Sequence, residues 1–394
     1  MKNTILILSF THSEKVVENF VEKIENGFRS LNLIVKHLTL GLDIKHQMAS
    51  INEAELAFIF SIGPYPLSLR INGEKVYDFF KCPIYMYCID NLLYDFARND
   101  ACRDFFTQAL SNPRFHMISA ERSFVDLYKN IQDSSGNSAS VSFMPMAGFF
   151  NSPLEKAIEK QNKICIIGNP GGLGVSGWNR EKSIFKTAEQ NNRIGLSNKQ
   201  IIKISDTLEA PEFLGNVAKV IIEEASLDYK ILLDQNFLIF ATSLDNFIRI
   251  RTRVNTVQSL EGFPVDFYGS GWEELFGHMS NFSFKGKISH FEIAKTAAQY
   301  QVLLNFDPNF EYGIHDRVFT ALGSGTKVIT NENGFISSIP KHNEMVYNYK
   351  INEPNIALIA EKALRETKEY THRSELVLKH NWTQRITQWI HSVS

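Results

Sequence analysis

The sequence has almost no excess charge of either sign. Its 394 residues include 41 Lys and Arg against 43 Asp and Glu, which gives a net charge of −2. Proteins dedicated to nucleic acid normally carry a basic excess, so this balance argues against that class of partner. A small anionic ligand needs only a local group of donors and is compatible with the balance.

Cysteine is scarce, and long hydrophobic runs are missing. None of the 4 Cys belongs to a C-x-x-C pair or has histidine at zinc spacing, so we expect buried thiols of a reducing compartment and no metal. The first apolar run, Ile5–Phe10, is shorter than the ~7–15 residues of a secretory signal, and no run nears the ~18 of a membrane span. The sequence therefore predicts a cytoplasmic protein without a transmembrane segment.

Several catalytic signatures are also missing. The sequence contains no P-loop, no G-x-S-x-G, no H-E-x-x-H and no D-x-D. What is present is ordinary for a globular protein, with 44% hydrophobic and 21% charged residues. Domains usually span about 100–200 residues, so the length favours two of them.

The N-terminal part alternates short apolar runs with stretches of helical spacing such as Glu14–Leu31. Strands separated by helices form βαβ units, which predict a parallel sheet with helices on both faces. We therefore expect a Rossmann-like domain over 1–155. Its expected strands are Ile5–Phe10, Leu33–Thr39, Ala54–Ile62, Pro83–Ile89, Phe115–Ala120 and Val141–Met144.

A second Rossmann-like domain is expected over 156–375, starting with the strand Lys163–Gly168. Residues of about 179–258 have helical spacing throughout and predict a helical insert, with helices at Ala218–Leu227, Asp234–Leu244 and Ile248–Leu260. Segment 376–394 is expected to be a closing helix that packs back on the N-terminal domain. The remaining expected elements are strands Val265–Tyr268, Phe282–Phe284, Val302–Phe306, Lys327–Thr330 and Met345–Tyr347, and helices Asp316–Ser324, Glu353–Thr367 and Ser374–Ser392.

The segment Asn305–Gly334 carries the most chemical information. A buried strand ends at Asn305, a polar loop follows, and a helix opens near His315–Arg317. In an open parallel sheet, ligands bind beyond the carboxyl ends of the strands, where a helix N-terminus attracts phosphate. His315 and Arg317 can add donors to the same oxygens. The alternative is that Asp316 merely caps the helix and Arg317 is solvated.

Two glycine-rich segments also follow predicted strands. Asp266–Glu273 reads DFYGSGWE, and Cys165–Trp178 contains a G-x-G-x-x-G at Gly172–Gly177. Glycine lets a ligand approach the backbone closely, although a tight turn explains each motif equally well. The three segments fall at strand ends of one domain, which favours a shared ligand site.

In order, FYGSGW, KGKI, VLLNF and GIHDRVFTALGSGTKVITN resemble the C-terminal domain of the bacterial CgeB-like glycosyltransferases of the spore-maturation type. CIDN at Cys88–Asn91, FMPMAGF at Phe143–Phe149, KICIIGN and NWTQRITQWI at Asn381–Ile390 are similar to other parts of that family. The resemblance implies a GT-B fold, an α/β architecture of two Rossmann-like domains whose parallel sheets face across a cleft. It also implies transfer of a hexose-like sugar from a nucleotide-diphosphate donor to an unknown acceptor, without metal or other cofactor.

The same resemblance assigns roles to individual residues. The leaving diphosphate would be stabilised by helix N–H groups, Arg317 and Lys287. If the enzyme inverts, a general base would come from the first domain, with Asp90 first and His12 second. The alternatives are that Asp90 caps the helix after Asn91 and that His12 is a loop residue without a catalytic role. Burial at a strand end is expected to raise the pKa of Asp90. The expected donor-binding residues are Gly168, Asn169, Gly269, Ser270, Gly271, Trp272, Lys287, Asn305, His315, Asp316, Arg317, Thr320, Asn331 and Glu332.

One position departs from the family pattern. Thr320 stands where the family usually has Glu, and a threonine hydroxyl cannot chelate a ribose diol as a carboxylate does. Glu332 is a possible substitute. Because a fold does not fix a function, a sugar-nucleotide epimerase or phosphorylase on the same scaffold is a second reading. The departure at Thr320 favours a third, a non-catalytic nucleotide-sugar-binding protein.

Overall fold

The computed structural model describes residues 2–10, 16–40, 47–48, 51–71, 73–135, 139–150, 159–171, 182–339, 341–353, 355–367 and 371–393. They form two compact units. The first comprises Met1–Met146, Asp228–Ile239 and Trp382–Ser394, and the second comprises Ala147–Leu227 and Phe240–Asn381. Asp228–Ile239, which was expected in the second domain, is grouped with the first unit.

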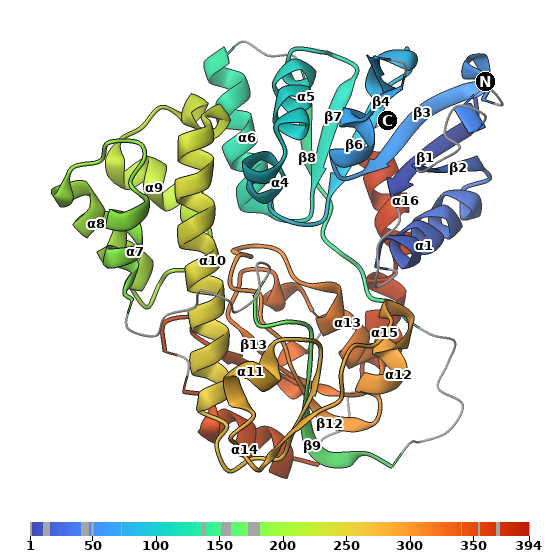
Figure 1. Ribbon diagram of the computed structural model, residues 1–394. Helices are drawn as coiled ribbons and strands as arrows, with labels where there is room; N and C mark the ends of the chain where they lie inside the picture. The colour runs from blue at the N-terminus through green and yellow to red at the C-terminus, as the bar shows by residue number, and fades with distance from the viewer. Residues whose placement is uncertain are drawn as a thin grey trace. The chain divides into compact units, whose positions relative to one another are not determined.

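A six-stranded parallel sheet with the order β2-β1-β3-β6-β7-β8 forms the centre of the first unit (Figure 1). Short apolar runs buried on both faces are typical of such sheets, so the expectation of a parallel sheet is confirmed. The strands are β1 Thr4–Phe10, β2 Ile34–Leu40, β3 Leu56–Ile62, β6 Ile84–Cys88, β7 Phe115–Ser119 and β8 Ser140–Phe143, and the hairpin β4 Arg70–Ile71 with β5 Glu74–Lys75 is separate. The helices are α1 Val16–Ser30, α3 Tyr65–Ser68, α4 Leu92–Arg98, α5 Asp100–Leu110, α6 Arg122–Ser135 and α16 Trp382–Val393.

The second unit has another six-stranded parallel sheet, with the order β11-β10-β9-β12-β13-β14. Numbered from its own first strand, this is the 3-2-1-4-5-6 order of dinucleotide-binding folds, and the order reverses between β9 and β12. The strands are β9 Gln161–Ile167, β10 Val265–Tyr268, β11 Phe282–Phe284, β12 Tyr300–Leu304, β13 Lys327–Asn331 and β14 Val346–Tyr349. The helices are α7 Ile184–Asn191, α8 Asn198–Glu209, α9 Val217–Ala225, α10 Gln235–Gln258, α11 Trp272–Phe276, α12 Ile293–Ala297, α13 Asp316–Gly323, α14 Ala357–Arg365 and α15 Arg373–Lys379.

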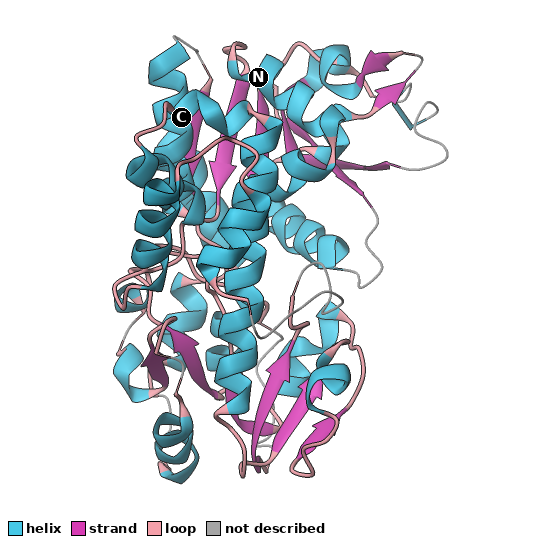
Figure 2. Cartoon of the chain, turned by 60° about the vertical axis from the view of Figure 1, so that its left-hand side comes forward, coloured by secondary structure: helices cyan, strands magenta, loops and turns pink. Residues whose placement is uncertain are grey.

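The core of the second unit lies between one face of its sheet and two helices. Val254 and Val257 of α10 and Ala360 of α14 pack with Ile164 of β9 and Phe267 of β10, all buried. Figure 2 shows the helices beside the strands of each sheet. Along α10, Asp234–Leu244 and Ile248–Leu260 were expected as separate helices. They are one continuous helix that begins in the first unit and continues in the second.

The prediction of one closing helix over Ser374–Ser392 is wrong, because the helix is interrupted between α15, which ends at Lys379, and α16, which begins at Trp382. The His380 ring stacks on Phe319, with centroids 4.7 Å apart, and its carbonyl accepts a bond from Gly148 N at 2.9 Å. Asn381 Nδ2 donates to the carbonyls of Val377 and Leu378, which ends α15. α15 belongs to the second unit and α16 to the first.

α16 is fixed to the first unit by aromatic packing. Trp389 is 3% exposed, and its ring lies edge-on to Phe28, Phe58, Phe60 and Tyr85 at centroid distances of 6.4, 6.1, 5.6 and 5.0 Å. Edge-to-face contacts within ~4.5–7 Å are favourable, and a buried tryptophan removes a large apolar area from water.

Replacing this ring should therefore destabilise the first unit. We expect Trp389→Ala to lower the free energy of unfolding by about 3–5 kcal/mol through loss of burial and the cavity left behind. Chemical denaturation followed by circular dichroism measures it, with Trp389→Phe as a milder control. A loss below ~1 kcal/mol would show that α16 does not cover this core.

Candidate functional site

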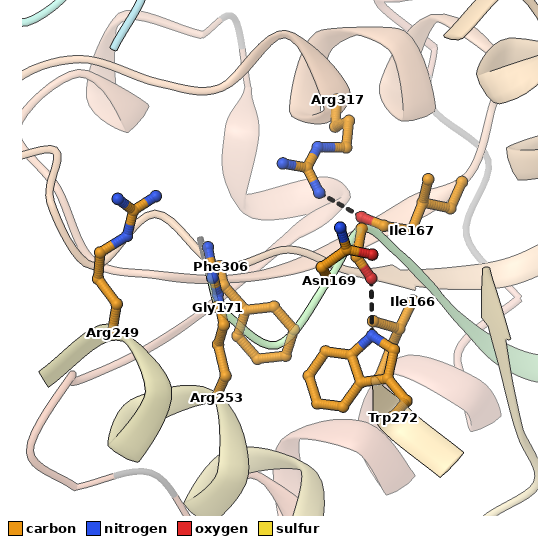
Figure 3. A pocket seen from close by; sticks show the side chains of 10 residues that line it. Ile166, Ile167, Asn169, Gly171, Arg249, Arg253, Trp272, Phe306 and Arg317 are labelled. Atoms are coloured by element: carbon orange, nitrogen blue, oxygen red, sulfur yellow. Dashed lines mark hydrogen bonds between the residues drawn. The ribbon is translucent and has the colours of Figure 1, made fainter. Parts of the chain in front are cut away.

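A pocket of ≈ 190 Å³ opens within the second unit where its strand order reverses (Figure 3). Ligands of open α/β sheets bind at this point, beyond the carboxyl ends of the strands. Pockets that enclose a whole drug-sized ligand usually measure ~300–1,000 Å³. The smaller volume here suits only the polar part of such a molecule. The described lining residues are Ile166, Ile167, Gly168, Asn169, Gly171, Arg249, Arg253, Trp272, Phe306 and Arg317.

Glycine is required where the chain leaves β9 and β10. Gly168 has φ +124°, and a Cβ there would lie 2.6 Å from Arg317 Nη1. Gly269 has φ +152°, and its Cβ would lie 2.3 Å from the Gly168 carbonyl oxygen. Side chains at these φ values are strained, and real atoms do not approach so closely. The turns after β9 and β10 therefore pack so closely that no side chain fits at position 168 or 269.

Trp272 and Asn169 hold these two turns together. Trp272 is 1% exposed, and its Nε1 donates to the Gly168 carbonyl at 2.6 Å. Asn169 Oδ1 accepts bonds from Ser270 N at 2.8 Å and Ser270 Oγ at 3.3 Å. Of the expected G-S-G-W residues, only Trp272 lines the pocket, while Gly269, Ser270 and Gly271 (φ +86°) shape the turn behind it.

Three arginines give the pocket its charge. Arg249 and Arg253 are four residues apart on α10 and share one face of that helix, and Arg317 comes from α13 (Figure 3). Arg253 Nη1 donates to Pro170 O at 3.3 Å, and its guanidinium lies 6.0 Å from the Phe306 ring centroid. Among the described lining residues none is acidic. Such a set of guanidinium groups is suited to binding phosphate oxygens.

Sequence reasoning found Arg317 and missed Arg249 and Arg253, which lay inside the region interpreted as a helical insert. A signal was present in IRIRTRV at Ile248–Val254. Arg249 and Arg253 are spaced i and i+4 and therefore lie on one face of the helix. The apolar residues around them indicate that this face borders the buried side of the helix.

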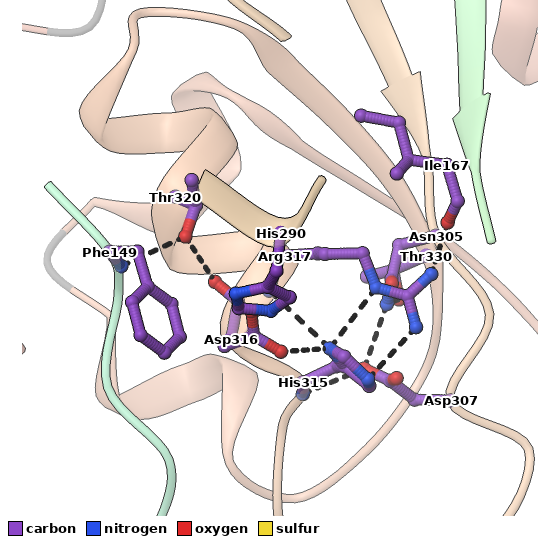
Figure 4. Close-up of polar contacts among 10 residues, drawn as sticks. All are labelled: Phe149, Ile167, His290, Asn305, Asp307, His315, Asp316, Arg317, Thr320 and Thr330. Atoms are coloured by element: carbon purple, nitrogen blue, oxygen red, sulfur yellow. Dashed lines mark hydrogen bonds and ion pairs between the residues drawn. The ribbon is translucent and has the colours of Figure 1, made fainter. Parts of the chain in front are cut away.

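Arg317 is fixed by its neighbours (Figure 4). Its Nη1 donates to the carbonyl of Ile167 at the end of β9, and its Nη2 lies 2.8 Å from His315 Nε2. The His315 Nδ1 contacts the carboxylate of Asp316, which also lies 3.2 Å from His290 Nε2. His315 and Asp316 therefore support Arg317 from behind, and neither lines the described pocket.

Asp316 is a buried carboxylate, 1% exposed. Burial alone would raise the pKa of this group, but the rings of His315 and His290 outweigh it and lower the pKa well below its usual range. His315 occupies the N-cap position of α13, since Asp316 is already the first helical residue. The alternative reading of Asp316 as the N-cap is therefore wrong.

Thr320 is buried one turn further along α13, at 1% exposure. Its hydroxyl donates to Asp316 O at 2.9 Å and accepts from Phe149 N at 3.0 Å. Both roles of the hydroxyl are used inside the protein, so the structure does not bring Thr320 to the pocket. The residue ties the 147–150 segment to α13 instead.

Asn305 and Asn331 are also buried, at 1% and 0% exposure, beneath the loop that leads to α13. Asn305 Nδ2 donates to Asp307 Oδ2 at 2.8 Å, and Asn331 Oδ1 accepts from Asp307 N at 2.7 Å. Asp307 Oδ2 in turn accepts from His315 N at 3.1 Å. These side chains support the loop, and none of them is among the described lining residues.

The remaining expected residues lie elsewhere. Lys287 and Glu332 are exposed and do not line the described pocket, and His12 and the G-x-G-x-x-G at 172–177 fall outside the described residues. Asp90 follows β6 in the first unit and is exposed, so its expected burial is wrong: the strand ends two residues earlier, at Cys88. No group of three or more His, Cys, Asp and Glu suited to a metal occurs among the described residues, and no described helix is long and apolar enough to cross a membrane.

The perturbed carboxylate near this strand end is Asp95, on α4. Its side chain keeps an exposed face, yet the protein around it and the nearby Asp90 carboxylate raise the pKa to about 6, with Arg98 opposing them. The folded state therefore binds this proton more tightly than the unfolded chain, whose aspartates titrate near pH ~4. Ionised Asp95 destabilises the fold above pH 6, and the penalty disappears below the unfolded-state pKa.

We expect Asp95→Asn to raise the melting temperature at pH 8 and to leave it unchanged at pH 4. Exposure screens the interaction, so the gain at pH 8 should stay below about 1 kcal/mol. Calorimetry of both proteins across this range measures it. An equal gain at both pH values would mean that the carboxylate's charge is not the cause.

Residues 249–391 match a family model described as "Glycosyl transferase-like". A search of the curated proteins finds no match. Among solved structures, the chain is similar to sucrose-phosphate synthase from Thermosynechococcus elongatus, with a TM-score of 0.54 and 11% identity over 99% of this chain and 98% of that one. It is also similar to HepE of Anabaena in complex with UDP and glucose, with a TM-score of 0.51 and 12% identity over 99% of both chains.

At this identity the similar structures establish the fold. Two parallel six-stranded sheets with their helices give the chain the GT-B architecture that the sequence predicted. The family match starts at Arg249 and includes Arg253, Trp272, Phe306 and Arg317 of the pocket. The CgeB-like subfamily and the individual roles of the site residues remain predictions.

Proposed function

We propose that the protein is a glycosyltransferase that takes a hexose-like sugar from a nucleotide diphosphate and transfers it to an acceptor. The observation that carries the proposal is the pocket with Arg249, Arg253 and Arg317 at the carboxyl end of β9. A diphosphate fits it in charge, and a volume of ≈ 190 Å³ suits that part of a nucleotide sugar better than the whole molecule. The glycosyl transferase-like match over the same residues supports this assignment.

The arginines would act on the leaving group. When the bond between sugar and diphosphate breaks, negative charge grows on the β-phosphate, and preorganised guanidinium groups stabilise it more than they stabilise the donor. Gly168 admits Arg317 beside the end of β9, and Arg253 is held at Pro170 O, so little reorganisation is required. We propose that these cations supply the charge stabilisation and that no metal is required.

We further propose that the first unit binds the acceptor. Asp90 is exposed after β6 and free of a helix-capping role, since Asn91 caps α4 through a bond from Leu93 N at 3.0 Å. An inverting transfer needs a base to take the acceptor proton, and Asp90 is the first candidate, with His12 second. UDP-glucose is the donor to test first, because HepE of Anabaena was crystallised with it.

Removal of Arg253 tests the pocket directly. We expect Arg253→Ala to weaken UDP binding about 10- to 100-fold, the effect of losing charge-assisted hydrogen bonds. The control is Arg251→Ala, because Arg251 lies on the same helix but contacts Glu209 Oε1 at 3.3 Å and Asn352 Oδ1 at 3.0 Å. Titration calorimetry measures both. Equal losses would indicate general charge or stability effects, and no loss in either would remove the pocket from the proposal.

Turnover separates the competing functions. With UDP-glucose and a panel of glycan and protein acceptors, we expect UDP release only when an acceptor is present, unchanged by EDTA. A new nucleotide sugar formed without acceptor would identify an epimerase instead. Tight UDP-glucose binding without any product would identify a binding protein. Product analysis by mass spectrometry distinguishes the three.

A further inference from the structure

A row of side chains connects a buried carboxylate to the arginine of the pocket. His290 Nε2 lies 3.2 Å from Asp316 Oδ2, the other oxygen of Asp316 contacts His315 Nδ1, and His315 Nε2 lies 2.8 Å from Arg317 Nη2. Figure 4 shows the His315 ring between the Asp316 carboxylate and the Arg317 guanidinium. Asp316 and His290 are buried, at 1% and 8% exposure, whereas His315 and Arg317 are half-buried.

The partners of the His315 ring decide its tautomer. A carboxylate only accepts, so the nitrogen facing Asp316 must carry hydrogen, whereas a guanidinium only donates, so the nitrogen facing Arg317 must carry a lone pair. The neutral ring protonated on Nδ1 meets both demands. Arg317 Nε and Arg317 N also point at Nδ1, at 3.2 and 3.5 Å. With the hydrogen of Nδ1 directed at Asp316, Nδ1 does not accept from these two donors, and Nε2 is the acceptor for Arg317.

The backbone of His315 is held as well. His315 N donates to Asp307 Oδ2 at 3.1 Å, and Asp307 is itself bound by Asn305 Nδ2 at 2.8 Å. One carboxylate thus fixes the chain at residue 315 and another fixes the ring. The ring has little freedom to rotate, and its Nε2 gives the Arg317 guanidinium a fixed acceptor.

From these contacts we infer that Asp316 is a positioning residue, which acts through His315 to hold the Arg317 guanidinium at the pocket. The effect on ligand binding rests on the proposed function, whereas the tautomer can be measured without any ligand. Stability alone is a poor reason for this arrangement, because a buried ion pair is often replaceable by apolar side chains without loss. Asp316 itself is not among the described lining residues.

A double-mutant cycle tests the inference with UDP as the probe, measured by titration calorimetry at pH 8. We expect Asp316→Asn to weaken UDP binding about tenfold in the wild-type background and by less than twofold in the Arg317→Ala background. Residues that act through one another are non-additive, whereas independent effects add. Equal losses in both backgrounds, or no loss in the first, would overturn the inference.

Two controls separate positioning from stability. Thr320→Val removes a buried polar group from the same helix and should lower the melting temperature without weakening UDP binding by more than about twofold. If it weakens binding as much as Asp316→Asn does, the role of Asp316 is structural. At position 315, a glutamine amide offers one donor and one acceptor as the neutral ring does. We expect His315→Gln to retain affinity and His315→Leu to lose about tenfold, and equal losses in both would contradict the inference.

The histidine tautomer gives a readout that does not depend on the proposed function. Two-bond ¹H–¹⁵N spectra of the wild-type protein at pH 8, assigned with His315→Gln, should show hydrogen on Nδ1 and none on Nε2. The opposite tautomer would overturn the inference even if UDP binds. Failure to bind UDP with the expected tautomer in place would instead count against the proposed function alone.

Discussion

The bond from the Arg317 guanidinium to the Ile167 carbonyl is the contact on which the candidate site depends. It joins the end of β9 to the start of α13, two segments 150 residues apart in the chain. Only a glycine at position 168 leaves room for it, because any Cβ there would meet Nη1 at 2.6 Å. The turn after β10 needs glycine for a related reason, since Gly269 packs against the Gly168 carbonyl. Close contacts within the protein thus explain the glycines at this sheet edge. The Arg317 guanidinium, for which Gly168 leaves room, makes the edge a candidate site.

Behind that edge lies a layer of buried polar side chains. Asp307 and Asp316, each 1% exposed, are the acids of this layer, and each is held by nitrogen donors of neighbouring segments. Burying a carboxylate is expensive unless hydrogen bonds and opposite charge compensate it. Asp307 is compensated by bonds from Asn305 Nδ2 and His315 N, and Asp316 by the rings of His315 and His290. These contacts also fix the backbone at the start of α13, where Arg317 lies.

The sequence was most informative where one physical pattern acts alone. The strands Val265–Tyr268 and Phe282–Phe284 were predicted to the residue. For the first, a short run with apolar residues that ends at glycine has few alternatives. Arg317 was found through its place after a strand. Arg249 and Arg253 were missed because a helix pattern says which face is apolar and does not say what that face approaches. The polar residues Thr320, Asn305 and Asn331 were expected at the ligand for their chemistry, but their partners are tertiary contacts such as Phe149 N and Asp307 that no local pattern reveals. Asp90 was wrongly expected to be buried because the sequence does not show where its strand ends or what packs over it.

The central claim is that the diphosphate of a nucleotide sugar binds between α10 and α13 at the carboxyl end of β9. A crystal structure of the protein with UDP tests it most directly. The account predicts phosphate density within hydrogen-bond distance of the Arg253 and Arg317 guanidinium groups, beside the Gly168 turn. UDP bound at another place, or an empty pocket at a concentration that saturates the protein in solution, would contradict it.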